Sequence, residues 1–172
     1  NQALNTFGGY GGTFSASTAI TGQTFTRLRQ MTISSPGTEA WSSGISCSNT
    51  QAITKGSICL MVVWVRSAGA EKAKVNLFLE RANTYEKEIL LTTEIGTQWQ
   101  QFVAPFDADF DYAAQQLNFG FHTGYKAQSI QIAGIALIDF KNKYSIDRFP
   151  IELHQNYAGS EANAAWRTEA DQ

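Results

Sequence analysis

The chain has 172 residues, of which 43% are apolar and 16% charged, with a formal net charge of −2 at pH 7. This length suits one domain with a proper core and is short for two. The slightly negative charge gives no support to a nucleic-acid-binding face, and no apolar run reaches membrane-spanning length. The opening stretch NQALNTFGGYGG lacks the charged start and apolar run of a signal peptide.

Strand patterns dominate the sequence as far as residue 140. Four segments alternate between apolar and polar residues or are rich in β-branched ones: CLMVVWVRS (59–67), VNLFLER (75–81), LNFGFH (117–122) and IQIAGIALIDF (130–140). Turn clusters such as FGGYGG, SSPGTE and TGYKAQ separate the segments, and no interior segment has a helical period. The pattern predicts an all-β fold, an antiparallel sandwich or jelly roll.

The alternation also predicts which residues face the core. In 75–81, Val75, Leu77 and Leu79 share one face, with Asn76 and Glu80 on the other. In 117–122 the pattern is cleaner, and it predicts a buried face of Leu117, Phe119 and Phe121 opposite a face of Asn118, Gly120 and His122.

Beyond Phe140 the sequence becomes polar and loses its periodicity. The last residues, ANAAWRTEADQ (162–172), have the spacing of a helix start, with Ala162, Trp166 and Ala170 on one face. We therefore expect a β domain over residues 1–141, and a linker with the start of a helix over 142–172.

The two cysteines, Cys47 and Cys59, are not in a CxxC pair, so a zinc site is not expected. Few charges and many Ser, Thr, Asn and Gln residues suit a secreted protein, in which the pair can form a disulfide. The alternative is two small buried side chains in neighbouring strands.

No GxSxG, HExxH or P-loop motif occurs, and His122 and His154 lie in different regions. Some jelly-roll enzymes cleave glycosidic bonds with two carboxylates, so Glu80, Glu86 and Glu88 are candidates. Nothing brings any pair of them to a defined spacing, and Glu86 and Glu88 are expected to be solvated.

The stretch DADFD (107–111) places three aspartates at alternating positions, and oxygen ligands suit calcium. It lacks the glycine and the distant glutamate of a calcium loop, so we interpret it as a solvated acidic turn. No metal site is predicted.

Two aromatic residues have polar surroundings. Trp41 follows the turn SSPGTEA, and Tyr85 lies in RANTYEK, so each is either a lid over the core or an exposed platform. An exposed ring can cover the apolar face of a pyranose while polar side chains bind its hydroxyl rim. Asn118 and His122 offer such polar groups, and Gly120 between them leaves room for a ligand.

Trp41, Tyr85 and His122 lie in stretches whose order and spacing are similar to those of a known family. In chain order the stretches are AWSSGIS, KGSICLMVVWVRS, FLERANTYEKE to TQWQQF, FHTGY and IQIAGIALI. Together, over about residues 25–140, they resemble carbohydrate-binding modules of the group containing families 4, 9 and 22. The resemblance implies a galactose-binding-domain-like β-sandwich jelly roll, commonly with a groove across the concave face of one sheet. Such modules often bind xylan or β-glucan chains.

The resemblance also implies a set of sugar-binding residues. These are two stacking aromatics, a groove histidine with a polar neighbour, a tyrosine at the groove end and a glutamate placed by strand parity alone: Trp41, Tyr85, His122, Asn118, Tyr125 and Glu80.

Two positions depart from the pattern of the family. Gly44 stands where relatives often carry an acidic residue, so one sugar contact is expected to be missing. Ala133 and Gly134 stand where relatives carry an aspartate that binds a structural calcium, so that calcium site is expected to be absent or rebuilt from other oxygens.

The tail NYAGSEANAAWRTEADQ resembles the junction that joins such modules to a glycoside hydrolase family 10 catalytic domain. The resemblance implies a secreted, non-catalytic, monomeric module that needs no cofactor. It would bind xylan or a related β-1,4- or β-1,3-linked glycan and target a tethered xylanase. The alternatives are a structural jelly-roll domain that has lost sugar binding, favoured by Gly44, and a small jelly-roll glycosidase.

Overall fold

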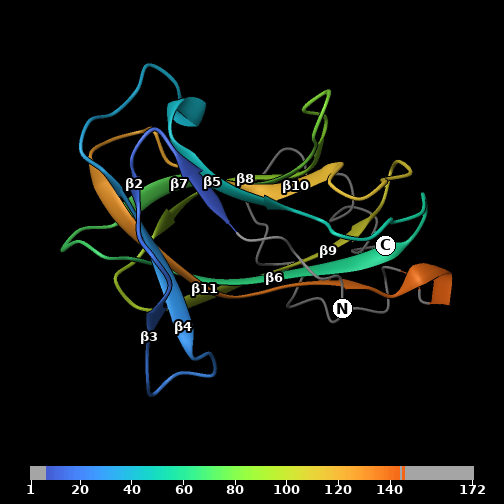
Figure 1. Cartoon of the computed structure of the whole chain (residues 1–172), viewed down its shortest axis with the longest axis horizontal. Helices are drawn as coiled ribbons and strands as arrows, with labels where there is room; N and C mark the ends of the chain where they lie inside the picture. The colour runs from blue at the N-terminus through green and yellow to red at the C-terminus, as the bar shows by residue number, and fades with distance from the viewer. Residues whose placement is uncertain (1–6, 144, 146–172) are drawn as a thin grey trace, which may run out of the picture.

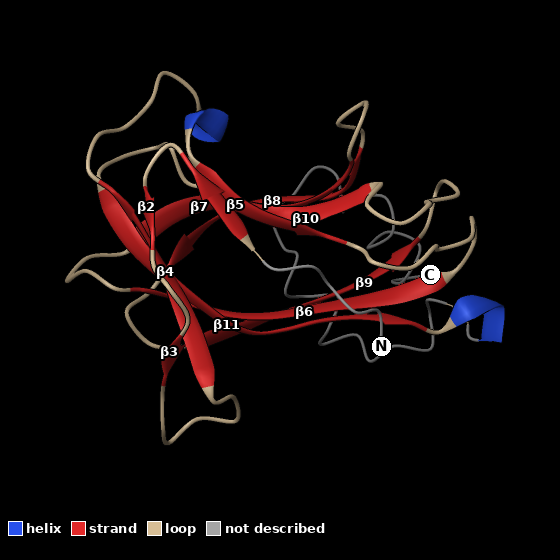
Figure 2. Ribbon diagram, in the orientation of Figure 1, coloured by secondary structure: helices blue, strands red, loops and turns tan. Residues whose placement is uncertain are grey.

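The computed structural model describes residues 7–143 and 145, which form two antiparallel β-sheets packed face to face (Figures 1 and 2). One sheet has the strand order β1-β5-β10-β7-β8; the other has β2-β4-β11-β6-β9, with β3 also paired to β4. The strands are β1 (Gly8–Tyr10), β2 (Thr13–Phe14), β3 (Thr18–Ala19), β4 (Arg27–Ile33), β5 (Gly44–Ser48), β6 (Ile58–Ser67), β7 (Ala73–Arg81), β8 (Lys87–Ile95), β9 (Gln100–Asp107), β10 (Leu117–His122) and β11 (Gln128–Asp139). The predicted all-β antiparallel sandwich is confirmed.

The core lies between the two sheets and follows the predicted alternation. The first sheet contributes side chains that are at most 1% exposed: Val75, Leu77, Leu79, Leu117, Phe119 and Phe121. The second sheet faces them with alternate residues of β6, namely Cys59, Met61, Val63 and Val65. Burial of each large aliphatic or aromatic side chain contributes about 1.5–3 kcal/mol, so the match between pattern and pleat is the main source of stability.

The outward face of the second sheet carries a small aromatic cluster. The ring of Phe25 lies 5.8 Å from that of Trp64 and 4.8 Å from that of Trp99, and the Arg66 guanidinium lies 4.8 Å from the Trp99 ring. Gly134 has φ +55°, and a Cβ there would lie 2.6 Å from Trp64. Trp64 and Trp99 therefore pack within this cluster and have a structural role.

The two cysteines are free and buried, so the disulfide alternative is wrong. Cys47 lies on β5 and Cys59 on β6, which belong to different sheets rather than neighbouring strands. Burial raises the pKa of the Cys59 thiol to about 12, and that of Cys47 still further. Both act as small apolar core residues.

The last described elements are β11 and a short 3-10 helix, η2 (Lys141–Lys143). The predicted helix start at 162–172, and nearly all of the predicted linker, lie outside the described residues. Among the residues that the structure describes, no helix is long and apolar enough to cross a membrane.

Candidate functional site

The outer face of the five-stranded sheet carries three rows of side chains set by the strand register. The first row crosses the sheet as Tyr10, Gly44, His122, Asn76 and Thr92. The second row is Ser46, Gly120, Phe78 and Leu90, and the third is Ser48, Asn118, Glu80 and Lys87. The face predicted to be polar therefore brings together residues from β1, β5, β10, β7 and β8.

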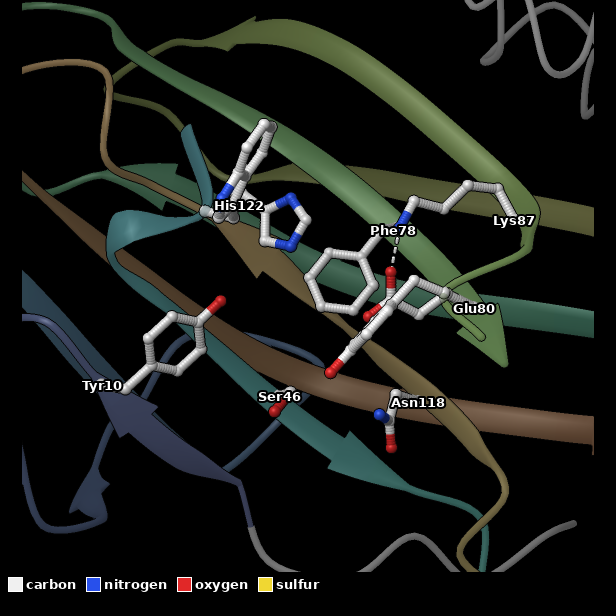
Figure 3. Close-up of a pocket in the computed structure, with 9 residues that line it drawn as sticks. Tyr10, Ser46, Phe78, Glu80, Lys87, Asn118 and His122 are labelled. Atoms are coloured by element: carbon white, nitrogen blue, oxygen red, sulfur yellow. Dashed lines mark hydrogen bonds and ion pairs between the residues drawn. The ribbon is translucent and has the colours of Figure 1, made fainter. Parts of the chain in front are cut away.

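A groove of about 540 Å³ lies over these rows (Figure 3). It is lined by Tyr10, Trp41, Ser46, Phe78, Glu80, Tyr85, Lys87, Asn118 and His122. Three large hydrophobic residues are exposed in the described part of the chain: Tyr10 at 41%, Trp41 at 60% and Tyr85 at 66%. All three line this groove, so exposed aromatic surface is concentrated there.

Trp41 lies on the short 3-10 helix η1 (Ala40–Ser42), directly before β5. This turn is held by the loop after β10, because Gly124 N–H donates to the Ala40 carbonyl at 2.8 Å and Thr123 N–H donates to the Ser43 carbonyl at 2.8 Å. The helix buries none of its residues. Of the two alternatives for Trp41, the structure has the exposed platform.

Tyr85 lies in the turn between β7 and β8 and is also an exposed platform. Its φ is +59°, a left-handed conformation that costs a tyrosine about 1–2 kcal/mol. Its N–H donates to the Arg81 carbonyl at 2.9 Å. The Glu86 carboxylate accepts hydrogen bonds from Thr84 Oγ1 at 2.7 Å and from Arg81 Nη1 at 3.2 Å. These contacts hold the turn in a conformation that presents the ring.

The floor of the groove is built on Phe78, whose ring stacks on His122 with 4.3 Å between centroids. Burial, with a smaller contribution from Lys87, lowers the pKa of His122 to about 4. The imidazole is therefore neutral near pH 7 and offers one donor and one acceptor nitrogen. A Cβ on Gly120 would lie 2.0 Å from the Ile45 carbonyl oxygen and 2.9 Å from Phe78. The expectation that Gly120 leaves room for a ligand is therefore wrong: its space is taken by the neighbouring strand and by Phe78.

The charged part of the floor is an ion pair between Glu80 and Lys87, drawn as a dashed line in Figure 3. Glu80 is only 5% exposed, and the Lys87 ammonium also lies 5.7 Å from the Phe78 ring. A buried carboxylate needs such a partner because its desolvation is costly. The pair gives the groove one anionic and one cationic group with no net charge.

Five of the six predicted site residues line this groove together: Trp41, Glu80, Tyr85, Asn118 and His122. Tyr125 lines an adjoining hollow of about 340 Å³, which also contacts Trp41. The Tyr125 hydroxyl donates to Asn76 Oδ1 at 2.6 Å, and the Lys74 ammonium lies 4.6 Å from its ring. Tyr125 is therefore placed beyond Trp41, outside the main groove.

Four groove residues were not predicted: Tyr10, Ser46, Phe78 and Lys87. Phe78 had a sequence signal, because it is a large apolar residue on the face that also carries Glu80. Lys87 had none, because a bulge between Leu79 and Glu80 shifts its register. Tyr10 lies in FGGYGG, which the sequence indicates only as a turn.

The other two candidate carboxylates, Glu86 and Glu88, are not among the residues that line the groove. Glu86 is exposed, but Glu88 is not simply solvated as predicted: Tyr112 Oη and, at 2.9 Å, Asp109 N–H both donate to its Oε1. Burial raises the pKa of Glu88 to about 7, even though these two hydrogen bonds act to lower it. Among the described residues that line the groove, Glu80 is the one carboxylate.

The acidic stretch 107–111 is tied into neighbouring loops. Asp111 Oδ1 accepts a hydrogen bond from Lys55 N–H at 2.8 Å. Within residues 7–143, no group of three or more His, Cys, Asp or Glu side chains is placed to hold a metal ion. Ala133 lies on β11 and is 4% exposed.

No protein-family model matches the chain, and a search of curated proteins finds no match. Solved structures do match. A family 4 carbohydrate-binding module ("CBM4 structure and function") aligns with a TM-score of 0.61 and 12% identity, covering 77% of this chain and 94% of that one. The CBM22-1 xylan-binding domain of Paenibacillus barcinonensis Xyn10C aligns at 0.58 and 16%, covering 78% and 86%.

A third structure holds the CBM22-1 and GH10 modules of Clostridium thermocellum xylanase 10B with xylohexaose. It aligns with a TM-score of 0.59 and 14% identity, covering 81% of this chain and 27% of that longer one. At these identities the shared feature is the fold. The β-sandwich jelly roll predicted from the sequence is the fold of these modules.

Proposed function

We propose that this protein is a non-catalytic carbohydrate-binding module whose groove binds a β-linked glycan chain of the xylan or β-glucan type. One observation carries the proposal: the three exposed large aromatic residues of the described chain all line a single groove with a polar floor. Flat rings cover the apolar faces of pyranose units, and placed polar groups bind the hydroxyl rim.

Each groove residue has a chemical role in this proposal. Trp41 and Tyr85 stack on sugar rings from the two turns that border the groove. Asn118 offers an amide donor and acceptor, and His122 offers a neutral imidazole. Glu80 accepts hydroxyl hydrogen bonds with the carboxylate oxygen that Lys87 leaves open. Binding is expected to be weak because most of the ligand stays solvated and a flexible chain must be ordered.

Three neighbouring structures support the glycan class. The relatives that share this fold include a xylan-binding domain, a xylanase fragment complexed with xylohexaose, and the N-terminal cellulose-binding domain of Cellulomonas fimi β-1,4-glucanase C. The last aligns with a TM-score of 0.57 and 13% identity, covering 77% of this chain and 88% of that one. Within the proposal, the module is secreted, monomeric and tethered to a xylanase that it holds on its substrate.

The alternative is a structural jelly-roll domain without a sugar site. Gly44, which supplies no side chain to the groove, is the observation that favours it. The glycosidase alternative has less support, because glycosidases usually place two carboxyl groups beside the scissile bond, and the described residues that line the groove include one carboxylate, Glu80.

The test is isothermal titration calorimetry of the whole chain with xylohexaose, cellohexaose and laminarihexaose. We expect millimolar to micromolar binding of at least one, and loss of about tenfold or more in affinity for Trp41→Ala and for Tyr85→Ala. Gln101→Ala, an exposed site on the other sheet, is the control and should bind as the wild type.

Two results would contradict the proposal. They are no binding to any of the three oligosaccharides, and unchanged affinity in both aromatic variants. Release of reducing sugar from xylan or β-glucan by the chain alone would favour the glycosidase instead.

A further inference from the structure

The segment FGGYGG (7–12) forms one end of the groove rather than a free turn. Its strand β1 pairs with β5 at the edge of the five-stranded sheet. The segment is anchored at its start, because Phe7 is 9% exposed and packs edge-on against Phe119 with 5.8 Å between ring centroids. The Phe7 carbonyl also accepts a hydrogen bond from Arg29 Nη1 at 2.5 Å. These contacts of Phe7 anchor the segment that carries Tyr10 to the core and to β4.

Glycine at position 11 brings this segment directly against the turn that carries Trp41. Gly11 has φ +66°, which strains any other residue, and a Cβ there would lie 2.2 Å from the Ser42 carbonyl oxygen. Ser42 is the last residue of η1, next to Trp41. The two aromatic residues at this end of the groove are therefore held by elements in direct contact.

Tyr10 occupies the space that a side chain at position 44 would need. Tyr10 and Gly44 are cross-strand partners in the first row of the sheet. A Cβ on Gly44 would lie 2.6 Å from Tyr10 Oη, 2.8 Å from Tyr10 Cζ and 2.6 Å from the Phe121 carbonyl oxygen. The next residue along the row is His122, and in Figure 3 Tyr10 and Lys87 stand on opposite sides of Phe78.

We propose that Tyr10 is a third sugar-contacting aromatic residue, and that the lack of a side chain at Gly44 leaves room for the Tyr10 phenol. This inference rests on the proposed function and deepens it. The ring supplies apolar surface at the β1 edge, and its hydroxyl both donates to and accepts from a sugar hydroxyl. The sugar contact expected to be missing at Gly44 is then made by a residue from another strand.

The positions of Tyr10 and Lys87 at opposite ends of the groove also indicate how long a bound glycan chain must be to contact both. Tyr10 on β1 and Lys87 on β8 are four strand spacings apart, about 19 Å at the usual separation of neighbouring strands. A ligand that contacts both ends is a chain of several sugar units that lies across the strands. Burial, and the nearby charge of Glu80, raise the pKa of the Tyr10 phenol, so its hydroxyl keeps its proton in neutral solution.

The test is a double-mutant cycle measured by calorimetry with the hexasaccharide that the wild type binds most tightly. Tyr10→Phe should bind about 2- to 10-fold more weakly through loss of one hydrogen bond, and Tyr10→Ala about tenfold or more. Gly44→Ala should lose affinity to a similar extent or more, because its methyl group meets both the Tyr10 phenol and the Phe121 carbonyl oxygen. The double variant Tyr10→Ala/Gly44→Ala should bind no more weakly than the single variant with the lower affinity, because both substitutions remove the same sugar contact.

Gly8→Ala is the matched control, because it adds a methyl group to the same strand, where nothing lies within 4 Å of the new Cβ. It should bind as the wild type. Thermal melts of all variants check the fold, and the NMR signals of the Tyr10 ring protons should shift when the hexasaccharide is added to the wild type.

Three results would overturn the inference while leaving the proposed function intact: wild-type affinity in Tyr10→Ala, wild-type affinity in Gly44→Ala, or losses that multiply in the double variant. Unchanged Tyr10 ring signals during binding would do the same. Absence of glycan binding by the wild type would instead overturn the proposed function, and the inference with it.

Discussion

Glu88 gives the sharpest prediction about stability. It lies at the start of β8, where Tyr112 Oη and Asp109 N–H donate to one of its oxygens. The carboxylates of Asp107 and Asp109 and the thiol of Cys59 are close enough to interact with its charge. Glu88→Gln keeps an oxygen that accepts both hydrogen bonds and removes the titration.

The expected magnitude follows from the raised pKa. A shift from 4.5 to about 7 corresponds to about 3 kcal/mol of preference for the neutral form, which partial exposure to solvent reduces to about 2 kcal/mol. Because the folded state holds the proton more tightly than the unfolded state, this contribution is fully present below pH 4.5. It is lost as the pH rises to about 7.

The assay is urea unfolding followed by tryptophan fluorescence at pH 4.5 and pH 8. At pH 4.5 the wild type and Glu88→Gln should have similar free energies of unfolding. At pH 8 the variant should be more stable by about 2 kcal/mol. A variant that is no more stable than the wild type at pH 8, or less stable at both pH values, would show that burial of Glu88 does not favour its neutral form.

Three further predictions concern the groove. Tyr85→Asn should be as stable as the wild type or more so by about 1 kcal/mol, since asparagine tolerates the left-handed conformation, and it should lose about tenfold in glycan affinity; melts and calorimetry on one sample separate the two effects. Lys87→Ala should lower the free energy of unfolding by about 2–3 kcal/mol, because it leaves the buried Glu80 carboxylate without its ion-pair partner. In the same urea assay, the double variant Glu80→Gln/Lys87→Met should recover most of this loss, because it removes both charges. Glycan affinity should be constant from pH 5 to 8 and fall below about pH 4, where His122 gains a charge near Lys87; an affinity that drops between pH 7 and 6 would contradict the lowered pKa.

Much of the fold follows from the sequence because strand periodicity is local. The alternation of Val75, Leu77 and Leu79 with polar residues is enough to place them in the core, where each is 0% exposed. Trp41 and Tyr85 are also recognisable locally, since each is a large aromatic in a polar stretch. Whether such a residue is a lid or a platform is a matter of tertiary contacts, and the structure decides it in favour of exposure.

The rest of the site depends on register, which no local pattern contains. Tyr10 enters the groove because β1 pairs with β5 opposite Gly44, thirty-four positions away by the numbering. Lys87 reaches Glu80 only through a bulge. The burial of Glu88 likewise depends on the loop that carries Tyr112, which is distant in sequence.

Whether the groove on the five-stranded sheet binds glycan can be observed directly by ¹H–¹⁵N NMR during a titration of the whole chain with xylohexaose and cellohexaose. We expect the indole N–H signal of Trp41 and the amide signals of Asn118 and His122 to shift with at least one of the two oligosaccharides. The indole signals of Trp64, on the opposite sheet, and of Trp99, directly before its strand β9, should stay in place. Shifts confined to Trp64 and Trp99, or no shift with either oligosaccharide, would contradict glycan binding in this groove.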